Sequence, residues 1–74
     1  MDYEPKEPGQ HLIYLGLGSN LGRRAANLHA GLQLLQAAGI RLEALSSVYE
    51  TAPWGGVEQP DFYNLVAAGW TGLA

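Results

Sequence analysis

The sequence has no cysteine and only two histidines, which excludes disulfides and a thiolate zinc site within its 74 residues. Positive charge is also scarce. Four Lys and Arg against seven Asp and Glu give a net charge of −3 with no basic patch, so duplex nucleic acid is not an expected partner. No apolar run approaches the roughly 20 residues that a membrane-spanning helix needs, and no membrane partner is expected. The first ten residues, MDYEPKEPGQ, have no apolar signal region, and together these absences predict a cytoplasmic protein.

Hydrophobic residues, by contrast, are plentiful. They make up 47% of the chain, which is typical of a globular protein and argues against a disordered one. The short length is the difficulty, because a domain of this size buries only about 60% of the surface that its unfolded chain exposes. Small folds usually compensate with disulfides or a metal. The chain is therefore either a small two-layer domain or a piece of a larger one.

The first half of the sequence predicts a strand followed by a helix. Residues 1–10 contain two prolines and a glycine and are expected to be a disordered lead-in. Residues 11–17 (HLIYLGL) have apolar side chains on both faces, which predicts a central strand. The chain then breaks at GSNLG, and helical spacing predicts a helix over residues 24–38 that ends at Gly39 in the left-handed conformation. The apolar stripe that carries this prediction consists of Leu21, Ala25, Leu28, Leu32 and Leu35.

The second half predicts two more strands. Residues 40–51 alternate in polarity like a half-covered strand, and residues 52–61 form a loop rich in proline and glycine. Residues 62–70 form the third strand. A helical crossover makes the first two strands parallel, and the ten-residue loop allows the second and third to pair antiparallel. The expected fold is α+β, a ferredoxin-like α/β sandwich truncated to β-α-β-β. One face of the third strand should carry Phe62, Asn64, Val66, Ala68 and Trp70.

The first candidate site is the turn formed by Gly18, Ser19 and Asn20, between the first strand and the helix. Backbone N–H groups at a helix start favour an anion, and the Asn20 amide is able to donate to a ligand oxygen. The sequence nevertheless contains neither GxxxxGK[ST] nor GxGxxG, so it is not a known phosphate loop. The alternative is a structural turn in which Ser19 or Asn20 lies near a helix cap.

The second candidate site combines the loop TAPWGG (51–56) with QPDFYN (59–64). Phe62 and Asn64 project from one face of a strand, so Phe62 is placed to stack on a flat heterocycle while Asn64 bonds its edge. The alternative is that Phe62 belongs to the core and Asn64 meets the loop, although asparagine is disfavoured in mid-strand. Other charged or titratable groups are interpreted as surface residues: Glu58, Asp61, His11 and His29. Arg23 and Arg24 open the helix, where cations are unfavourable unless an anion lies nearby.

Taken together, YLGLGSNLGRRAANL, SSVYETAPWGG and QPDFYN closely resemble the 6-hydroxymethyl-7,8-dihydropterin pyrophosphokinase family of folate biosynthesis. Three motifs match in order and spacing, from about Leu12 to Trp70. The resemblance implies a transferase that moves pyrophosphate from ATP to the hydroxymethyl group of a reduced pterin. It also implies pterin-binding roles. Asn20 would lie near the hydroxymethyl end, Thr51 and Trp54 would offer backbone groups, Phe62 would stack on the ring, and Asn64 would hydrogen-bond it.

The family's ATP and Mg²⁺ ligands, which include a D-x-D pair, do not occur in this sequence. No catalytic or metal-binding residue is therefore expected here, and residues 11–74 are interpreted as the N-terminal part of the enzyme domain. Such a part would supply half of a pterin pocket and be inactive alone, while the complete enzyme is expected to be a monomer. The alternative is a small non-catalytic ferredoxin-like module that binds a ligand or partner through its open sheet edge.

Overall fold

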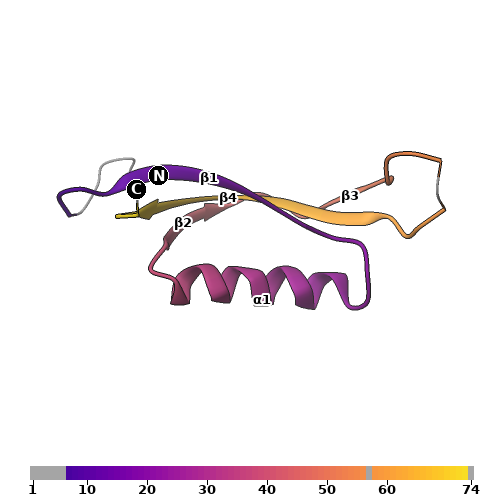
Figure 1. The fold of residues 1–74 in the computed structure, drawn as a ribbon, viewed down its shortest axis with the longest axis horizontal. Coiled ribbons are helices and arrows are strands. Elements are labelled where there is room, and N and C mark those ends of the chain that lie inside the picture. The colour runs from indigo at the N-terminus through magenta and orange to yellow at the C-terminus, as the bar shows by residue number, and fades with distance from the viewer. Residues whose placement is uncertain (1–6, 57, 74) are drawn as a thin grey trace.

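The computed structural model describes residues 7–56 and 58–73, which form one sheet and one helix (Figure 1). β4 pairs antiparallel with each of the other strands, in the order β1-β4-β2, and β3 lies beside the first residues of β4. β1 and β2 therefore run parallel to each other with β4 between them. The predicted α+β class and β-α-β-β order are confirmed, with β2 and β3 together in the place of the second predicted strand. The elements are β1 (His11–Ser19), α1 (Arg24–Ala37), β2 (Arg41–Leu45), β3 (Tyr49–Thr51) and β4 (Phe62–Thr71).

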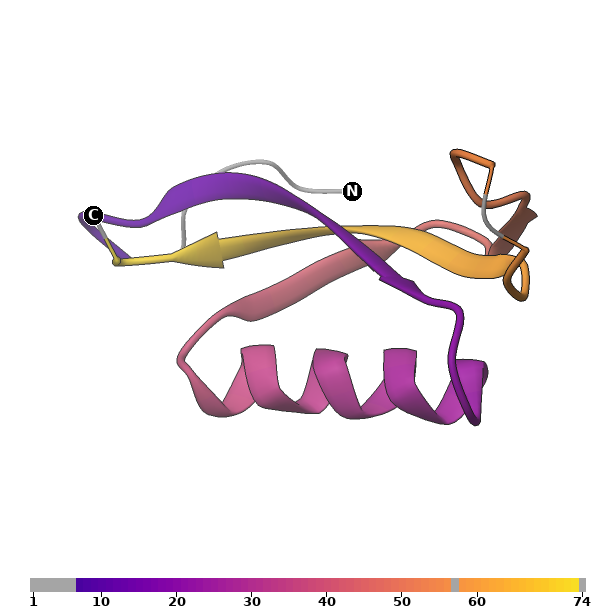
Figure 2. The ribbon, with the colours of Figure 1, turned by 45° about the vertical axis from the view of Figure 1, so that its right-hand side comes forward.

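The helix covers one face of the sheet (Figures 1 and 2). Leu28 of α1 packs against Leu65 and Ala67 of β4 in the buried core. Because side chains alternate along a strand, the odd-numbered residues of β4 face the helix and the even-numbered residues face away from it. The predicted shared face from Phe62 to Trp70 is thus confirmed as the face opposite α1. Partly buried residues around the core are Leu17, Leu32, Leu42 and Tyr63.

The helix ends as its sequence predicts. Gly39 has φ +96°, and its N–H bonds the Gln36 carbonyl oxygen at 3.1 Å. The Ile40 N–H reaches back to the Leu35 carbonyl oxygen at 3.0 Å, which completes a Schellman motif. The apolar stripe is only partly confirmed, because Leu21 precedes the helix and is 69% exposed. No helix in the described part of the chain is long and apolar enough to cross a membrane.

The prediction that the first strand is central is wrong. Among the described strands β1 pairs only with β4, and its Tyr14 side chain is 64% exposed, whereas β4 is the central strand. Apolar side chains on both faces of a strand do not by themselves specify its position in the sheet. β1 also continues through Gly18 and Ser19, past the predicted break.

The prediction of one continuous strand over residues 40–51 is also wrong. The register shifts between Leu42 and Ala44, so that Leu42 faces Gly69 while Ala44 faces Ala68. Glu43 is the extra residue of this bulge, and it moves the following side chains to the opposite face. β2 then ends at Leu45. Ser46 bridges the gap to β3, because its N–H donates to the Val66 carbonyl oxygen and its Oγ accepts from the Val66 N–H, each at 2.8 Å.

The predicted lead-in is described only at its end, since residues 1–6 lie outside the described residues. Glu7, Pro8 and Gly9 are exposed. The Gln10 side-chain oxygen accepts a hydrogen bond from Arg41 Nη2 at 3.5 Å, which brings the start of β1 close to β2.

Candidate functional site

Three of the five predicted pterin-binding residues lie together on the face opposite α1. Thr51 of β3 pairs with Phe62 of β4, and Asn64 lies two residues further along β4. The Asn64 amide Nδ2 donates to the Thr51 hydroxyl oxygen at 2.6 Å. Phe62 and Asn64 are half-buried and Thr51 is exposed. This cluster places an aromatic ring, an amide and a hydroxyl side by side, as a site for a flat polar heterocycle requires.

Gly18 provides the space that this arrangement needs. It lies opposite Asn64 in the β1–β4 ladder. A Cβ atom at Gly18 would be 2.8 Å from Asn64 Oδ1 and 3.8 Å from Phe62 Cδ1. The first of these distances is too short for any side chain at position 18 while Asn64 keeps its present rotamer. Sequence reasoning treated Gly18 as part of a turn and missed this close approach, which depends on the strand register.

Asn20 links the turn after β1 to the loop before β4. Its Nδ2 donates to Gln59 Oε1 at 2.7 Å and to the Pro60 carbonyl oxygen at 3.2 Å. Neither Ser19 nor Asn20 caps the helix itself, because Arg23 occupies the N-cap and no side-chain cap bond is made. The first candidate site is thereby joined to the second at one end of the sheet (Figure 2).

Asn27 of α1 was not identified from the sequence, yet it supports the same turn. Its Nδ2 donates to Ser19 Oγ at 3.1 Å and to the Leu21 carbonyl oxygen at 2.9 Å. In the sequence, Asn27 is only a polar residue outside the apolar stripe of the helix. Such residues are common on any exposed helix face, so the sequence did not indicate its role. Asn27 therefore stabilises the conformation of the turn that carries Asn20.

Trp54 is not brought to the cluster. Its side chain is 96% exposed and lies in a bend in which Gly55 has φ +92°. The indole ring is therefore unpacked, and only the backbone groups of this bend remain as candidates for ligand contact.

Arg24 makes the one ion pair found in the described part of the chain. Its Nη1 lies 3.1 Å from Glu50 Oε2 and also donates to the Asp61 carbonyl oxygen at 2.7 Å. The guanidinium carbon lies 3.8 Å from the centroid of the Tyr63 ring, which is a cation–π contact. Glu50 is thus the nearby anion that an arginine at a helix start requires, and sequence spacing alone did not identify it.

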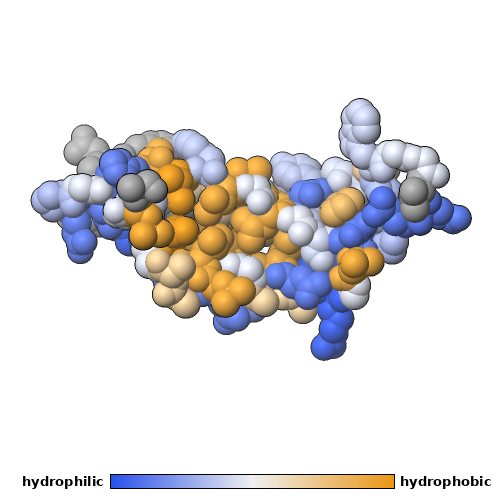
Figure 3. All heavy atoms as spheres, in the orientation of Figure 1, coloured by the Kyte–Doolittle hydropathy of each residue, from blue (hydrophilic) through white to orange (hydrophobic). Residues whose placement is uncertain are grey.

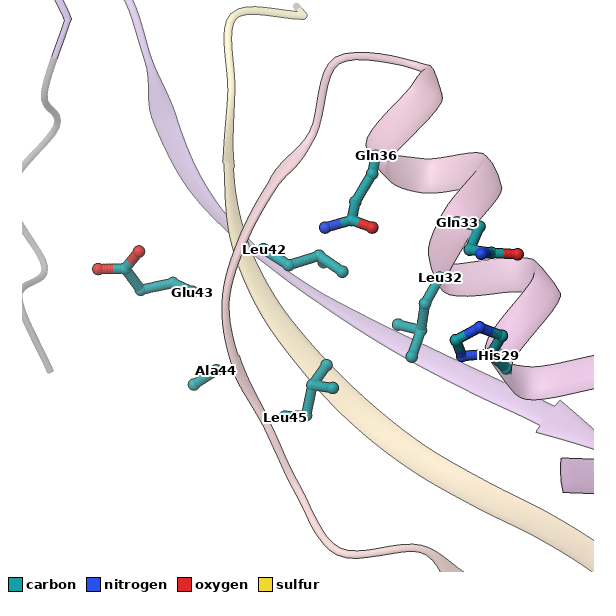
Figure 4. A pocket seen from close by; sticks show the side chains of 8 residues that line it. All are labelled: His29, Leu32, Gln33, Gln36, Leu42, Glu43, Ala44 and Leu45. Carbon is teal, nitrogen blue, oxygen red and sulfur yellow. The ribbon is translucent and has the colours of Figure 1, made fainter. Parts of the chain in front are cut away.

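A separate groove of about 380 Å³ lies between α1 and β2, away from the five predicted residues (Figure 4). Leu32 and Gln36 of α1 face Leu42 across it. Figure 3 shows hydrophobic side chains gathered between the sheet and the helix, while the end that carries β3 and the loops is mostly polar. His11, His29, Glu58 and Asp61 are exposed, as predicted. Within residues 7–56 and 58–73, no three His, Cys, Asp or Glu residues lie close enough to hold a metal ion.

Fold and site together define an α+β protein that carries an aromatic ring, an amide and a hydroxyl side by side at one end of an antiparallel sheet. The sequence model described as 7,8-dihydro-6-hydroxymethylpterin-pyrophosphokinase matches residues 14–74. The chain belongs to this family, which confirms the resemblance read from its three motifs.

Curated relatives agree with the family. A 2-amino-4-hydroxy-6-hydroxymethyldihydropteridine pyrophosphokinase of Porphyromonas gingivalis is 49% identical over 57 residues, which cover 77% of this chain and 39% of that protein. The enzyme of the same name from Methylorubrum extorquens is 48% identical over 56 residues, which cover 74% of this chain and 35% of that protein. A mitochondrial folate synthesis bifunctional protein of Arabidopsis thaliana is 39% identical over 64 residues, which cover 86% of this chain and 12% of that protein. The matched segment thus spans about two fifths of these relatives' length or less.

Proposed function

We propose that this chain supplies one side of the pterin pocket of a 6-hydroxymethyl-7,8-dihydropterin pyrophosphokinase. The observation that carries the proposal is the hydrogen bond between Asn64 and Thr51, at 2.6 Å, on the same face as Phe62. Family membership supports the choice of a pterin among flat heterocycles. The residues of the proposed site are Asn20, Thr51, Trp54, Phe62 and Asn64.

Phe62 and Asn64 each offer a group that the structure leaves available for a proposed contact. Phe62 presents a half-buried ring for stacking on the pterin. Asn64 uses one of its two Nδ2 protons on Thr51, so a second proton and Oδ1 are left for the ring edge. The backbone groups of Thr51 and Trp54 would bind the same edge, and Asn20 would lie near the hydroxymethyl group.

The proposal assigns ATP and Mg²⁺ to residues outside these 74. Mg²⁺ and cationic side chains neutralise charge on the phosphates during such a transfer. The described residues provide no cluster of His, Cys, Asp or Glu side chains for the ion. Transfer of pyrophosphate from ATP to the hydroxymethyl group is proposed for the complete protein, with this chain inactive alone. We also propose that the complete enzyme is a cytoplasmic monomer that binds neither nucleic acid nor membrane.

Asn64→Ala is expected to weaken pterin binding by about 1–3 kcal/mol, because ring donors and acceptors would lose their partners. The measurement is a titration of the complete protein that contains this chain with 6-hydroxymethylpterin, followed by ¹H–¹⁵N NMR. Shifts should concentrate at Thr51, Phe62 and Asn64. Gln36→Ala is the matched control, since it removes an amide from the distant groove and should leave the affinity unchanged. Equal dissociation constants for wild type and Asn64→Ala would contradict the proposed site.

A calorimetric titration of the wild-type chain with ATP and Mg²⁺ is expected to show no binding. The physical reason is that phosphate binding needs converging cationic and metal-ligating groups, whereas Arg24 is already committed to Glu50 and Asp61. Micromolar binding of ATP would contradict the assignment of the nucleotide site to other residues. A stable folded monomer of these 74 residues that melts cooperatively would favour the non-catalytic module instead.

A further inference from the structure

Arg24 contacts every segment that carries the proposed pterin-binding cluster on β3 and β4. It is the first residue of α1, and its side chain is 26% exposed. One nitrogen, Nη1, bonds both Glu50 of β3 and the carbonyl oxygen of Asp61, the residue just before β4. The guanidinium plane also lies over the Tyr63 ring, which belongs to β4. A single side chain thereby joins the start of the helix to the ends of two strands.

Each of these contacts is adjacent in sequence to a residue of the cluster. Glu50 precedes Thr51, Asp61 precedes Phe62, and Tyr63 lies between Phe62 and Asn64. In a strand, neighbouring side chains point to opposite faces. Arg24 therefore lies on the helix side of the sheet, behind the face that Thr51, Phe62 and Asn64 share, and acts on them through the backbone.

The position of Arg24 is not explained by stability alone. A cation in the first turn opposes the helix dipole, and this first turn contains no acidic residue. The partner Glu50 is 53% exposed, and an exposed ion pair adds little to stability. β3, with only three residues, also has few ladder bonds of its own to fix it against β4. Arg24 is better explained by its contacts with Glu50 and Asp61, which fix the end of β3 relative to the start of β4.

We infer that Arg24 is a positioning residue of the pterin pocket, which holds the ends of β3 and β4 so that Thr51, Phe62 and Asn64 keep one binding face. The inference rests on the proposed function for its ligand, but the positioning itself can be measured without a ligand. Arginine suits the role because Nη1 donates to both acceptors while the planar guanidinium lies over the Tyr63 ring. The compact ammonium of lysine does not reproduce this planar contact with the ring.

The test compares Arg24→Gln and Arg24→Lys with the adjacent control Arg23→Gln. Without ligand, the NMR cross-peak between the Asn64 side-chain amide and the Thr51 methyl group should be lost in Arg24→Gln and retained in Arg23→Gln. Amide exchange at Ala67 and Trp70, both buried in β4, reports whether the rest of the sheet stays folded. With 6-hydroxymethylpterin, the dissociation constant should rise about tenfold in Arg24→Gln. Arg24→Lys should recover only part of that loss.

The outcomes separate positioning from general stability and from the choice of ligand. A variant Arg24→Gln that melts at a lower temperature but keeps the Asn64–Thr51 cross-peak and the pterin affinity would overturn the inference, since the residue would then be merely structural. If the complete wild-type protein that contains this chain fails to bind pterin, the proposed function fails. The ligand-free cross-peak still decides the role of Arg24, because its persistence in Arg24→Gln would overturn positioning and its selective loss would support it.

Discussion

Replacing Gly69 with alanine is expected to lower the free energy of unfolding by about 1–3 kcal/mol. Gly69 lies in the last third of β4, opposite Ile13 of β1 and Leu42 of β2. A Cβ atom there would be 2.9 Å from the Arg41 carbonyl oxygen and 3.0 Å from Ile40 Cγ2. The carbonyl belongs to the backbone of β2, so it has no rotamer by which to move away. The α1–β2 connection would have to shift as a whole.

That loss is large for this protein. Native domains have only about 0.05–0.15 kcal/mol of stability per residue, and small domains bury a smaller share of their surface. The buried hydrophobic residues of the described chain are few, and two of the six are alanines: Leu28, Ile40, Leu65, Ala67, Ala68 and Trp70. Urea unfolding followed by circular dichroism should therefore show that Gly69→Ala loses a large share of the total unfolding free energy.

The matched control is Gly16→Ala in β1, because a Cβ at Gly16 would have no atom within 4 Å. Alanine there should be neutral or add up to about 1 kcal/mol, since glycine loses more backbone freedom on folding. Equal unfolding free energies for the two variants would show that β2 does not approach β4 as closely as the structure has it.

The sequence predicted those features of the fold that depend on neighbouring residues along the chain. The leucine spacing and Gly39 set the extent and the end of α1, and the alternation from Phe62 to Trp70 identified one face of β4 correctly. The central position of β4 was missed because strand order depends on which strands pair, and each strand's own pattern reports only its burial. The bulge at Glu43 was missed for a similar reason, since one extra residue leaves the polarity pattern nearly unchanged.

The candidate site shows the same division. Phe62 and Asn64 could be identified because they share a strand and a face, and Thr51 joined them through a matching motif. The contacts of Gly18, Asn27 and Arg24 could not be predicted from spacing. They join residues from different elements, as in the bonds from Arg24 to Glu50 and Asp61, and only the packing of α1 on the sheet brings these groups together.

Gly18→Ala is expected to weaken pterin binding by about 1–3 kcal/mol while leaving the fold almost as stable as before. The new Cβ would lie 2.8 Å from Asn64 Oδ1, the free end of a side chain, so the amide would rotate away and lose its bond to Thr51. Losing one hydrogen bond costs about 0.5–1.5 kcal/mol of stability, and replacing a strand glycine with alanine returns about 0.5–1 kcal/mol. The two changes nearly cancel in folding, whereas the ligand site loses its oriented amide.

A double-mutant cycle with Asn64→Ala isolates this mechanism. Pterin dissociation constants and urea unfolding would be measured for both single variants and for the double variant. Once Asn64 is alanine, the atom that position 18 would hit is gone, and the next contacts, Phe62 Cδ1 at 3.8 Å and the Tyr63 carbonyl oxygen at 3.7 Å, are ordinary van der Waals distances. Gly18→Ala should then cost no further affinity. A full additional loss in the Asn64→Ala background would mean that Gly18 meets the ligand directly, and the empty space opposite Asn64 would have to be reassigned to the pterin itself.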